Sequence, residues 1–302
     1  MTQFLSTKRD IKSFRRRYWF LISVMSLCLN INHNRVYGFI PNIYEPNAEH
    51  LRMTGNRMAS IASKFIQYGP TKEGTNLAKL AVTLYPKKVE LWMILAEGQI
   101  KINKLDDAMV SINKAKIYNP ELPELWFAEA SISLRQNKPQ KAIKAIQLGL
   151  KFDPKNAIAY FQLGNAKLIL NKKSEALKDF VKSSKLKPDY WQSKNNQGLV
   201  LYELGKKEQA ISIWRNVLKI TNDAEPKLAL AAALNEKKSK IEESIELAKE
   251  ALNSNPNYVS QKHQKEQLWG VKLQAATKEL FKNPKLETAI NKAMANSNYE
   301  NN

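Results

Sequence analysis

The stretch Ala157–Tyr190, AIAYFQLGNAKLILNKKSEALKDFVKSSKLKPDY, is one unit of a pattern that repeats along the chain. The period continues without an insertion through six units, from about Gly55 to Tyr258. Prolines mark it at Pro86, Pro120, Pro154, Pro188 and, after a skipped step at Asn222, Pro256. A fixed period of about 34 residues is typical of solenoids, in which each unit packs only on its neighbours. The sequence therefore predicts one elongated array instead of two globular domains.

Large and small residues alternate within the quoted unit in a way that suits two antiparallel helices. Gly164 and Ala176 are small, as a close helix crossing requires, and Leu163 and Phe180 are large enough to fill the space around it. Pro188 ends the second helix because proline cannot continue one. The other units keep most of these positions, and the first unit keeps the fewest, which is common for a terminal repeat.

Period and residue pattern together resemble the tetratricopeptide-repeat family over residues 55–258. The resemblance implies an all-α fold, a right-handed superhelical solenoid of about six helix-turn-helix repeats whose first helices line a concave groove. The segments GNAKLIL, NNQGLVLYELG and KEQLWG, with the leader and the bias toward Asn and Lys, are also similar to exported cyanobacterial members of the family.

The leader, residues 1–38, has the three-part pattern of a secretory signal peptide. A basic run over residues 8–17 precedes an apolar run over residues 18–29, and a cleavage site would follow Gly38. An uncleaved membrane anchor is the alternative, although a helix of the apolar run is only about 18 Å long against the roughly 30 Å hydrocarbon layer. Both interpretations predict repeats exported to the periplasm or thylakoid lumen, or anchored at a membrane. Residues 39–54, with two prolines, are expected to form an extended lead-in.

The period stops after Pro256. Val259–Phe281 is predicted to be an amphipathic helix with Trp269 as a core plug, the first of the capping helices expected over residues 259–295. Such a lid would cover the last hydrophobic face of the array. The polar tail, residues 296–302, is expected to be disordered.

The residues that catalysis, metals or cofactors require are scarce. Cys28 is a single thiol, the histidines His33, His50 and His263 are far apart, and no phosphate-binding glycine loop is present. The paired acids near the starts of second helices favour the positive end of the helix dipole. We therefore expect no enzymatic activity, no catalytic residues, no metal and no cofactor.

The concave positions of the first helices are the remaining candidates for function. Asn165 and Asn196 are placed to hold a peptide backbone, because an amide both donates and accepts. Phe161 replaces the lysine of the carboxylate clamp found in some family members, so acidic C-terminal tails are not the expected ligand. The aromatic residues have a second interpretation, packing between repeats. The predicted partner-binding groove consists of Phe127, Phe161, Asn165, Gln192, Asn195, Asn196 and Tyr202.

These observations predict a non-catalytic scaffold that binds a peptide segment or helix of another protein, in the assembly or maintenance of a membrane protein complex. The net charge of +20 leaves an alternative, a basic solenoid that binds an anionic membrane surface or polymer. A simple compositional bias that yields a solvated lysine-rich surface explains the same charge. Neither nucleic acid nor a small-molecule substrate is favoured.

Overall fold

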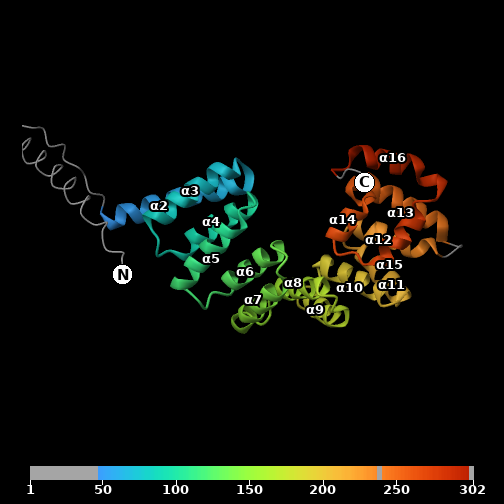
Figure 1. Ribbon diagram of the computed structural model, residues 1–302, viewed down its shortest axis with the longest axis horizontal. Coiled ribbons are helices and arrows are strands. Elements are labelled where there is room, and N and C mark those ends of the chain that lie inside the picture. Colours follow the sequence, from blue (N-terminus) through green and yellow to red (C-terminus); the bar gives the residue numbers. More distant parts are fainter. Residues whose placement is uncertain (1–46, 237–239, 299–302) are drawn as a thin grey trace, which may run out of the picture. The chain divides into compact units, whose positions relative to one another are not determined.

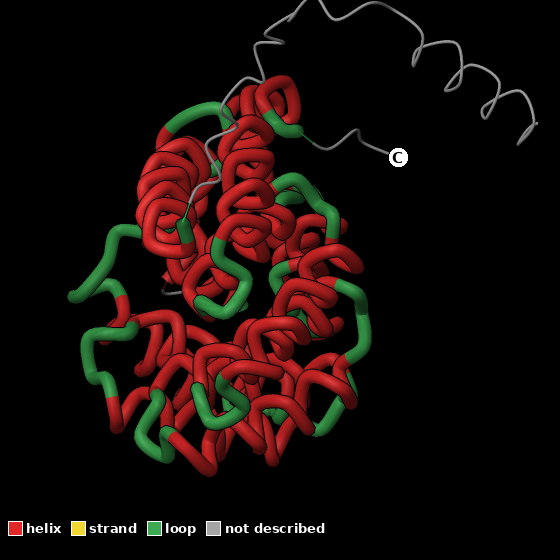
Figure 2. Tube along the Cα trace, turned by 90° about the vertical axis from the view of Figure 1, so that its left-hand side faces the viewer, coloured by secondary structure: helices red, strands yellow, loops and turns green. Residues whose placement is uncertain are grey.

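The computed structural model describes residues 47–236 and 240–298, and within these ranges the chain consists of helices, turns and loops with no strand. The leader and most of the lead-in lie outside the described residues. Consecutive helices pack in six pairs, each joined to the next by a short loop (Figures 1 and 2). The paired helices are α2 (Ala48–Tyr68), α3 (Thr71–Leu84), α4 (Val89–Lys101), α5 (Leu105–Tyr118), α6 (Pro123–Arg135), α7 (Pro139–Phe152), α8 (Ala157–Ile169), α9 (Lys173–Leu186), α10 (Trp191–Glu203), α11 (Lys207–Val217), α12 (Ala224–Asn235) and α13 (Ile241–Ser254).

Helix boundaries repeat with the period of the sequence. The first helices α4, α6, α8 and α10 begin one repeat length apart, and α5, α7, α9 and α11 do the same. The turn between the paired helices uses a left-handed residue at equivalent places, namely Asn103, Asn137, Asn171 and Gly205, with φ between 55° and 80°. Glycine and asparagine adopt this conformation more readily than other residues, so each turn closes in the same geometry. The predicted all-α solenoid of six helix pairs is confirmed.

Small residues at the crossing of the paired helices make room for an aromatic ring. In the fourth pair, a Cβ on Gly164 would lie 2.5 Å from Cε1 of Phe180, whose side chain is fully buried. In the fifth pair, Gly198 faces the indole of Trp214 in the same way, at 2.5 Å from Nε1. The small position of the first helix thus accommodates the large residue at the centre of the second.

The first helix begins earlier than the lead-in prediction allowed. α2 starts at Ala48, so residues 48–54 are helical and not extended. Asn47 explains the difference: its side chain accepts a hydrogen bond from the His50 amide at 2.8 Å and caps the helix.

The segment after the array is also broken into more pieces than predicted. It contains η3 (Pro256–Val259), α14 (Gln261–Glu266), α15 (Val271–Leu280), η4 (Pro284–Leu286) and α16 (Glu287–Asn296). The single helix expected over Val259–Phe281 is therefore wrong, because the chain turns between α14 and α15 with Leu268 at a φ of 64°. α16 packs on α13 and η3, at the end of the array, whereas α15 packs on α12 and α10 (Figure 1). Trp269 is 3% exposed, as expected of a core residue.

Candidate partner-binding groove

The predicted groove residues lie on three successive first helices. Phe127 is on α6 and Phe161 and Asn165 are on α8, whereas Gln192, Asn195, Asn196 and Tyr202 are on α10. The register of the repeats makes Phe161 and Asn195 equivalent positions of neighbouring units. The structure nevertheless gives the helices different surroundings, because α15 packs on α10 but has no comparable packing on α8.

The two phenylalanines take part in packing between helices. The ring of Phe127 lies against Gly149 of α7, where a Cβ would meet Cε1 at 2.4 Å. The Phe161 ring centroid is 5.8 Å from that of Phe180 and 5.1 Å from that of Tyr190, in an edge arrangement with the latter. Both side chains stay half-buried, so packing and access to the groove coexist at these positions.

The asparagines form a hydrogen-bonded row that connects two repeats. Asn196 Nδ2 donates to Asn165 Oδ1 at 3.0 Å, and Asn195 Nδ2 donates to Asn196 Oδ1 at 3.4 Å. Asn165 is half-buried, whereas Asn195 has no exposed surface. Of the three amides, Asn165 is therefore the most accessible to solvent, and its hydrogen bond with Asn196 fixes its orientation.

Tyr202 is buried to 1% exposure and does not line an open surface. Its hydroxyl donates to Glu236 Oε1 at 3.3 Å, and its ring lies 6.0 Å from that of Trp214. Burial, with the nearby Glu236 carboxylate, raises the pKa of the tyrosine well above its ordinary value. Tyr202 thus joins the fifth and sixth repeats from within.

The chain's own residues 258–273, which we call the strap, cover the concave side of α10 and α12. Trp269 Nε1 donates to Glu225 Oε1 at 3.0 Å, and Gln264 Nε2 donates to the Tyr258 carbonyl at 2.8 Å. Trp269 and Leu273 belong to the same core cluster as the residues of α12. The strap therefore packs on the first helices of the last two repeats.

Glu203, the last residue of α10, fixes the strap to the groove. Its Oε1 accepts hydrogen bonds from the backbone amides of Lys272 and Leu273, both at 3.0 Å. These amides are in the first turn of α15, so a carboxylate distant in sequence replaces the usual side-chain cap. Lys272 Nζ also donates to the Glu203 carbonyl at 2.8 Å. A Cβ on Gly270 would lie 2.1 Å from Cδ of Glu203, so the approach requires glycine.

Glu225 is a second carboxylate held by the strap. Trp269, Asn195 and Tyr258 all donate hydrogen bonds to it. Burial outweighs these bonds and raises the pKa of Glu225 to about 7. The pKa of Tyr258 is raised in turn, by burial and by the nearby carboxylate. The sequence analysis singled out neither Glu203 nor Glu225, since both act through contacts with residues far away in the chain.

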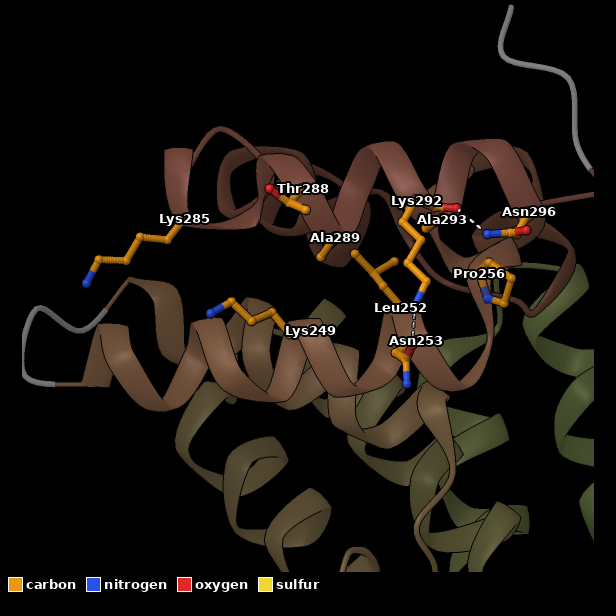
Figure 3. Close-up of a pocket in the computed structure, with 10 residues that line it drawn as sticks. All are labelled: Lys249, Leu252, Asn253, Pro256, Lys285, Thr288, Ala289, Lys292, Ala293 and Asn296. Atoms are coloured by element: carbon orange, nitrogen blue, oxygen red, sulfur yellow. Dashed lines mark hydrogen bonds between the residues drawn. The ribbon is translucent and has the colours of Figure 1, made fainter.

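A separate cavity of about 530 Å³ lies between α13 and α16 (Figure 3). Three lysines reach its rim, and each has a partner: Lys285 pairs with Glu242 at 2.5 Å, Lys249 pairs with Glu246 at 2.9 Å, and Lys292 donates to Asn253 at 3.1 Å. These lysines are thus engaged within the protein and do not converge on the cavity as an anion site.

The concave face of α8 remains open. Ile158 is 49% exposed and Ile169 39% exposed, and they flank Phe161 and Asn165 on the same helix. The equivalent of Ile169 on α10 is Glu203, which is covered by the strap. The exposed isoleucine of α8 therefore has a buried and hydrogen-bonded counterpart on α10.

Two other kinds of site are absent from the described part of the chain. No three His, Cys, Asp or Glu side chains in residues 47–236 and 240–298 come together as a metal site would require. Over the same ranges, every helix is too short or too polar to cross a bilayer.

These features define a helical-repeat solenoid, and residues 157–190 match the sequence model of the tetratricopeptide repeat. Residues 157–190 are thus similar to one tetratricopeptide repeat, and the helix pairs on either side follow the same period. No curated protein sequence matches the chain.

Three solved structures illustrate the shared fold. PilF of Pseudomonas aeruginosa has a TM-score of 0.59 at 15% identity, over 77% of this chain and 99% of that one. PilW, described as a type IV pilus biogenesis factor, has a TM-score of 0.55 at 16% identity, over 73% and 97%. MamA of Desulfovibrio magneticus RS-1 has a TM-score of 0.51 at 14% identity, over 55% and 94%. At these identities the likeness shows the fold alone.

Proposed function

We propose that this protein is a scaffold that binds a segment of another protein along the concave face of α4, α6 and α8. The observation that carries the proposal is the exposed apolar face of α8, with Ile158 and Ile169, next to a groove that the strap fills on α10 and α12. The strap supports the proposal, because it packs on the first helices α10 and α12 and its backbone amides donate hydrogen bonds to Glu203. The equivalent face of α8 is the place for a second polypeptide, supplied in trans.

The charges along the groove indicate the chemistry of the partner. Glu90 on α4 and Glu124 on α6 are exposed at the concave positions, whereas α8 offers isoleucine at the equivalent position. A matching segment would carry apolar side chains toward α8 and basic ones toward α4 and α6. Acidic side chains thus occupy this position on α4 and α6 although the whole protein is strongly basic.

We further propose that the partner belongs to a membrane protein complex that this scaffold helps to assemble or maintain. The support is the basic and apolar leader, which would export the repeats or anchor them at a membrane. The leader lies outside the described residues, and its fate is tested separately by sequencing the mature N-terminus: Phe39 would mean export, and Met1 or Thr2 an anchor.

Crosslinking in the native host provides the test of the groove. A photoreactive amino acid at Ile158 should capture a specific protein, whereas the same residue at Ile117, which is 70% exposed on α5, should not. With the photoreactive amino acid moved to Ile169, which is 39% exposed on the same helix, Ile158→Glu should weaken capture by about tenfold or more, since full burial of isoleucine contributes roughly 1.5–3 kcal/mol. Ile117→Glu is the matched control, and circular dichroism should be the same for both variants. Equal capture at both positions would refute the groove, and binding that ignores Ile158 but falls steeply with salt would favour the basic-surface alternative.

A further inference from the structure

The first helices α4, α6, α8 and α10 each pack on the second helix of the repeat before them, whereas α2 has no such neighbour among the described residues. Three positions of the first helix, which we call the stacking positions, make this contact. In the fifth repeat, the side chains of Ser193 and Gln197 form hydrogen bonds with α9, with Oγ of Ser193 2.6 Å from Oγ of Ser183. In the second repeat, a Cβ on Gly98 would lie 2.4 Å from Oγ1 of Thr75 on α3.

The stacking positions are covered in each of these four repeats. Their occupants are Leu91, Leu125, Ala159 and Ser193 at the first position, Leu95, Glu129, Leu163 and Gln197 at the second, and Gly98, Ile132, Ala166 and Val200 at the third. All of them are buried except Glu129, which is half-buried and forms an ion pair with Lys116 of α5. The contact between repeats can therefore include an ion pair as well as apolar packing.

The same positions of the first repeat are open. They are occupied by Arg57, Ile61 and Lys64 of α2, one repeat length before their counterparts on α4. Ile61 is 47% exposed, and the two basic residues are exposed as well. Their spacing of four and three residues places them on one face of the helix, which Tyr68, 89% exposed, continues for another turn. We call these four residues the end stripe.

The composition of the end stripe is not that of a surface that serves solubility alone. A terminal repeat needs a polar outer face to remain soluble, but isoleucine and tyrosine occupy two of the four places here. Arg57 and Lys64 have no ion-pair partner in the part of the chain that the structure describes. The end stripe thus offers apolar contact area together with two unpaired positive charges.

These charges exclude a second copy of this chain as the occupant. Two end stripes placed face to face would bring like charges together, which costs free energy. Stacking head to tail is prevented at the other end of the array, where α16 already packs on α13. The occupant that fits is a helix of another protein with acidic side chains.

We propose that the end stripe is a docking site for an amphipathic helix of a partner protein, which occupies the place that a preceding second helix would have. Its apolar side chains contact Ile61 and Tyr68, and its acidic side chains pair with Arg57 and Lys64. The pair between Lys116 and Glu129 is the internal precedent for an ion pair in this contact. The site goes beyond the proposed function, because the stacking positions differ from the concave positions that form the groove.

The test uses the full chain and two synthetic helical peptides of about 20 residues, a length at which helices form in water. Both have leucine along one face, and the residues that flank this face are glutamate in one peptide and lysine in the other. We expect the acidic peptide to shift the methyl NMR signal of Ile61 and to bind about fivefold or more tightly than the basic one. Equal affinities would overturn the assigned chemistry, and an unmoved Ile61 signal would overturn the site.

A matched pair of variants separates the end stripe from general attraction to a basic protein. Arg57→Glu with Lys64→Glu should abolish the preference for the acidic peptide. Lys72→Glu with Lys79→Glu makes the same change in net charge at exposed residues of α3, and the preference should remain. An equal loss of preference in both variants would refute the proposal.

Ile61→Glu distinguishes the other possible occupants. Because Ile61 is exposed, the variant should keep the urea midpoint of the unmodified protein while it loses the acidic peptide. A dimer that light scattering detects and that Ile61→Glu dissociates would assign the end stripe to a second copy instead. A lower urea midpoint, with no peptide bound by the unmodified chain, would mean that the chain covers this face itself, and would overturn the proposal. Ile158→Glu should leave peptide binding unchanged, so this site and the groove fail independently.

Discussion

Replacing Gly270 with alanine should detach the strap from α10. The backbone of Gly270, with φ of −80° and ψ of 170°, suits alanine, so the substitution adds no backbone strain. The new Cβ would, however, lie 2.1 Å from Cδ of Glu203, and the carboxylate has to move. Its two hydrogen bonds to the amides of Lys272 and Leu273 depend on that position. The perturbation therefore acts on one contact, between α10 and the start of α15.

The magnitude follows from these two bonds. A hydrogen bond to a charged group contributes about 1.5–3 kcal/mol, so losing both costs at least about 3 kcal/mol. Alanine also lowers the conformational entropy of the unfolded chain, which stabilises the folded state by about 0.4–1 kcal/mol. We expect a net loss of about 2 kcal/mol or more in the free energy of unfolding, measured by urea denaturation.

A control variant and a local measurement show whether any loss of stability comes from the strap. Gly69→Ala is the matched control, because its Cβ would meet only ordinary contacts of 3.5 Å or longer. Repeat arrays can unfold in parts, so hydrogen exchange should report α15 separately from the array, with faster exchange in Gly270→Ala alone. If Gly270→Ala stays within about 0.5 kcal/mol of the unmodified protein and α15 exchanges no faster, the account of strap docking is wrong.

Two further predictions concern the core and the pH dependence of stability. Gly164→Ala should destabilise by about 1–3 kcal/mol in thermal unfolding, because the added methyl group overlaps the buried Phe180 ring, and an unchanged Tm would refute that packing. The raised pKa of Glu225, about 7, means that the folded state binds the proton more tightly than the unfolded state. The free energy of unfolding should therefore fall as pH rises from about 4.5 to about 7, by about 2–3 kcal/mol. Glu225→Gln should remove that fall in stability. Burial lowers the pKa of His263, which makes an opposite contribution, but this contribution is the same in both proteins and cancels when they are compared. Parallel pH profiles of the variant and the unmodified protein would contradict the assignment.

The repeat architecture was predictable because it depends on local and periodic information. Each helix pair needs the same small and large residues at the same places, so the prolines and glycines of the sequence mark the pairs directly. The left-handed turn residues follow the same period, because Asn103, Asn137, Asn171 and Gly205 are each one repeat length apart. The positions of these turns were therefore also predictable from the sequence.

The strap was not predictable from the same information. Its docking depends on Glu203 and Lys272, which are 69 residues apart in the chain, and no periodic pattern connects them. Its break at Leu268 is equally hidden, since leucine rarely adopts a positive φ. The turn closes through the Trp269 amide, which donates to the Gln264 carbonyl at 3.0 Å. The burial of Tyr202 was not predictable for the same reason, because its position in the repeat does not indicate which other helices pack on it.

The composition of α12 explains why the array covers its own groove at one end and not at the other. Its residues 226–234 are all buried, on every side of the helix, and most are alanine or leucine. A helix that is apolar all round needs neighbours on all faces, and the strap supplies the one that the array lacks. α8 instead combines an apolar face with Asn165 and half-exposed isoleucines, which tolerate water while no partner is present. The covered end is therefore explained by folding alone, whereas the exposed apolar face of α8 is not, and for this reason we propose that α8 takes part in recognition.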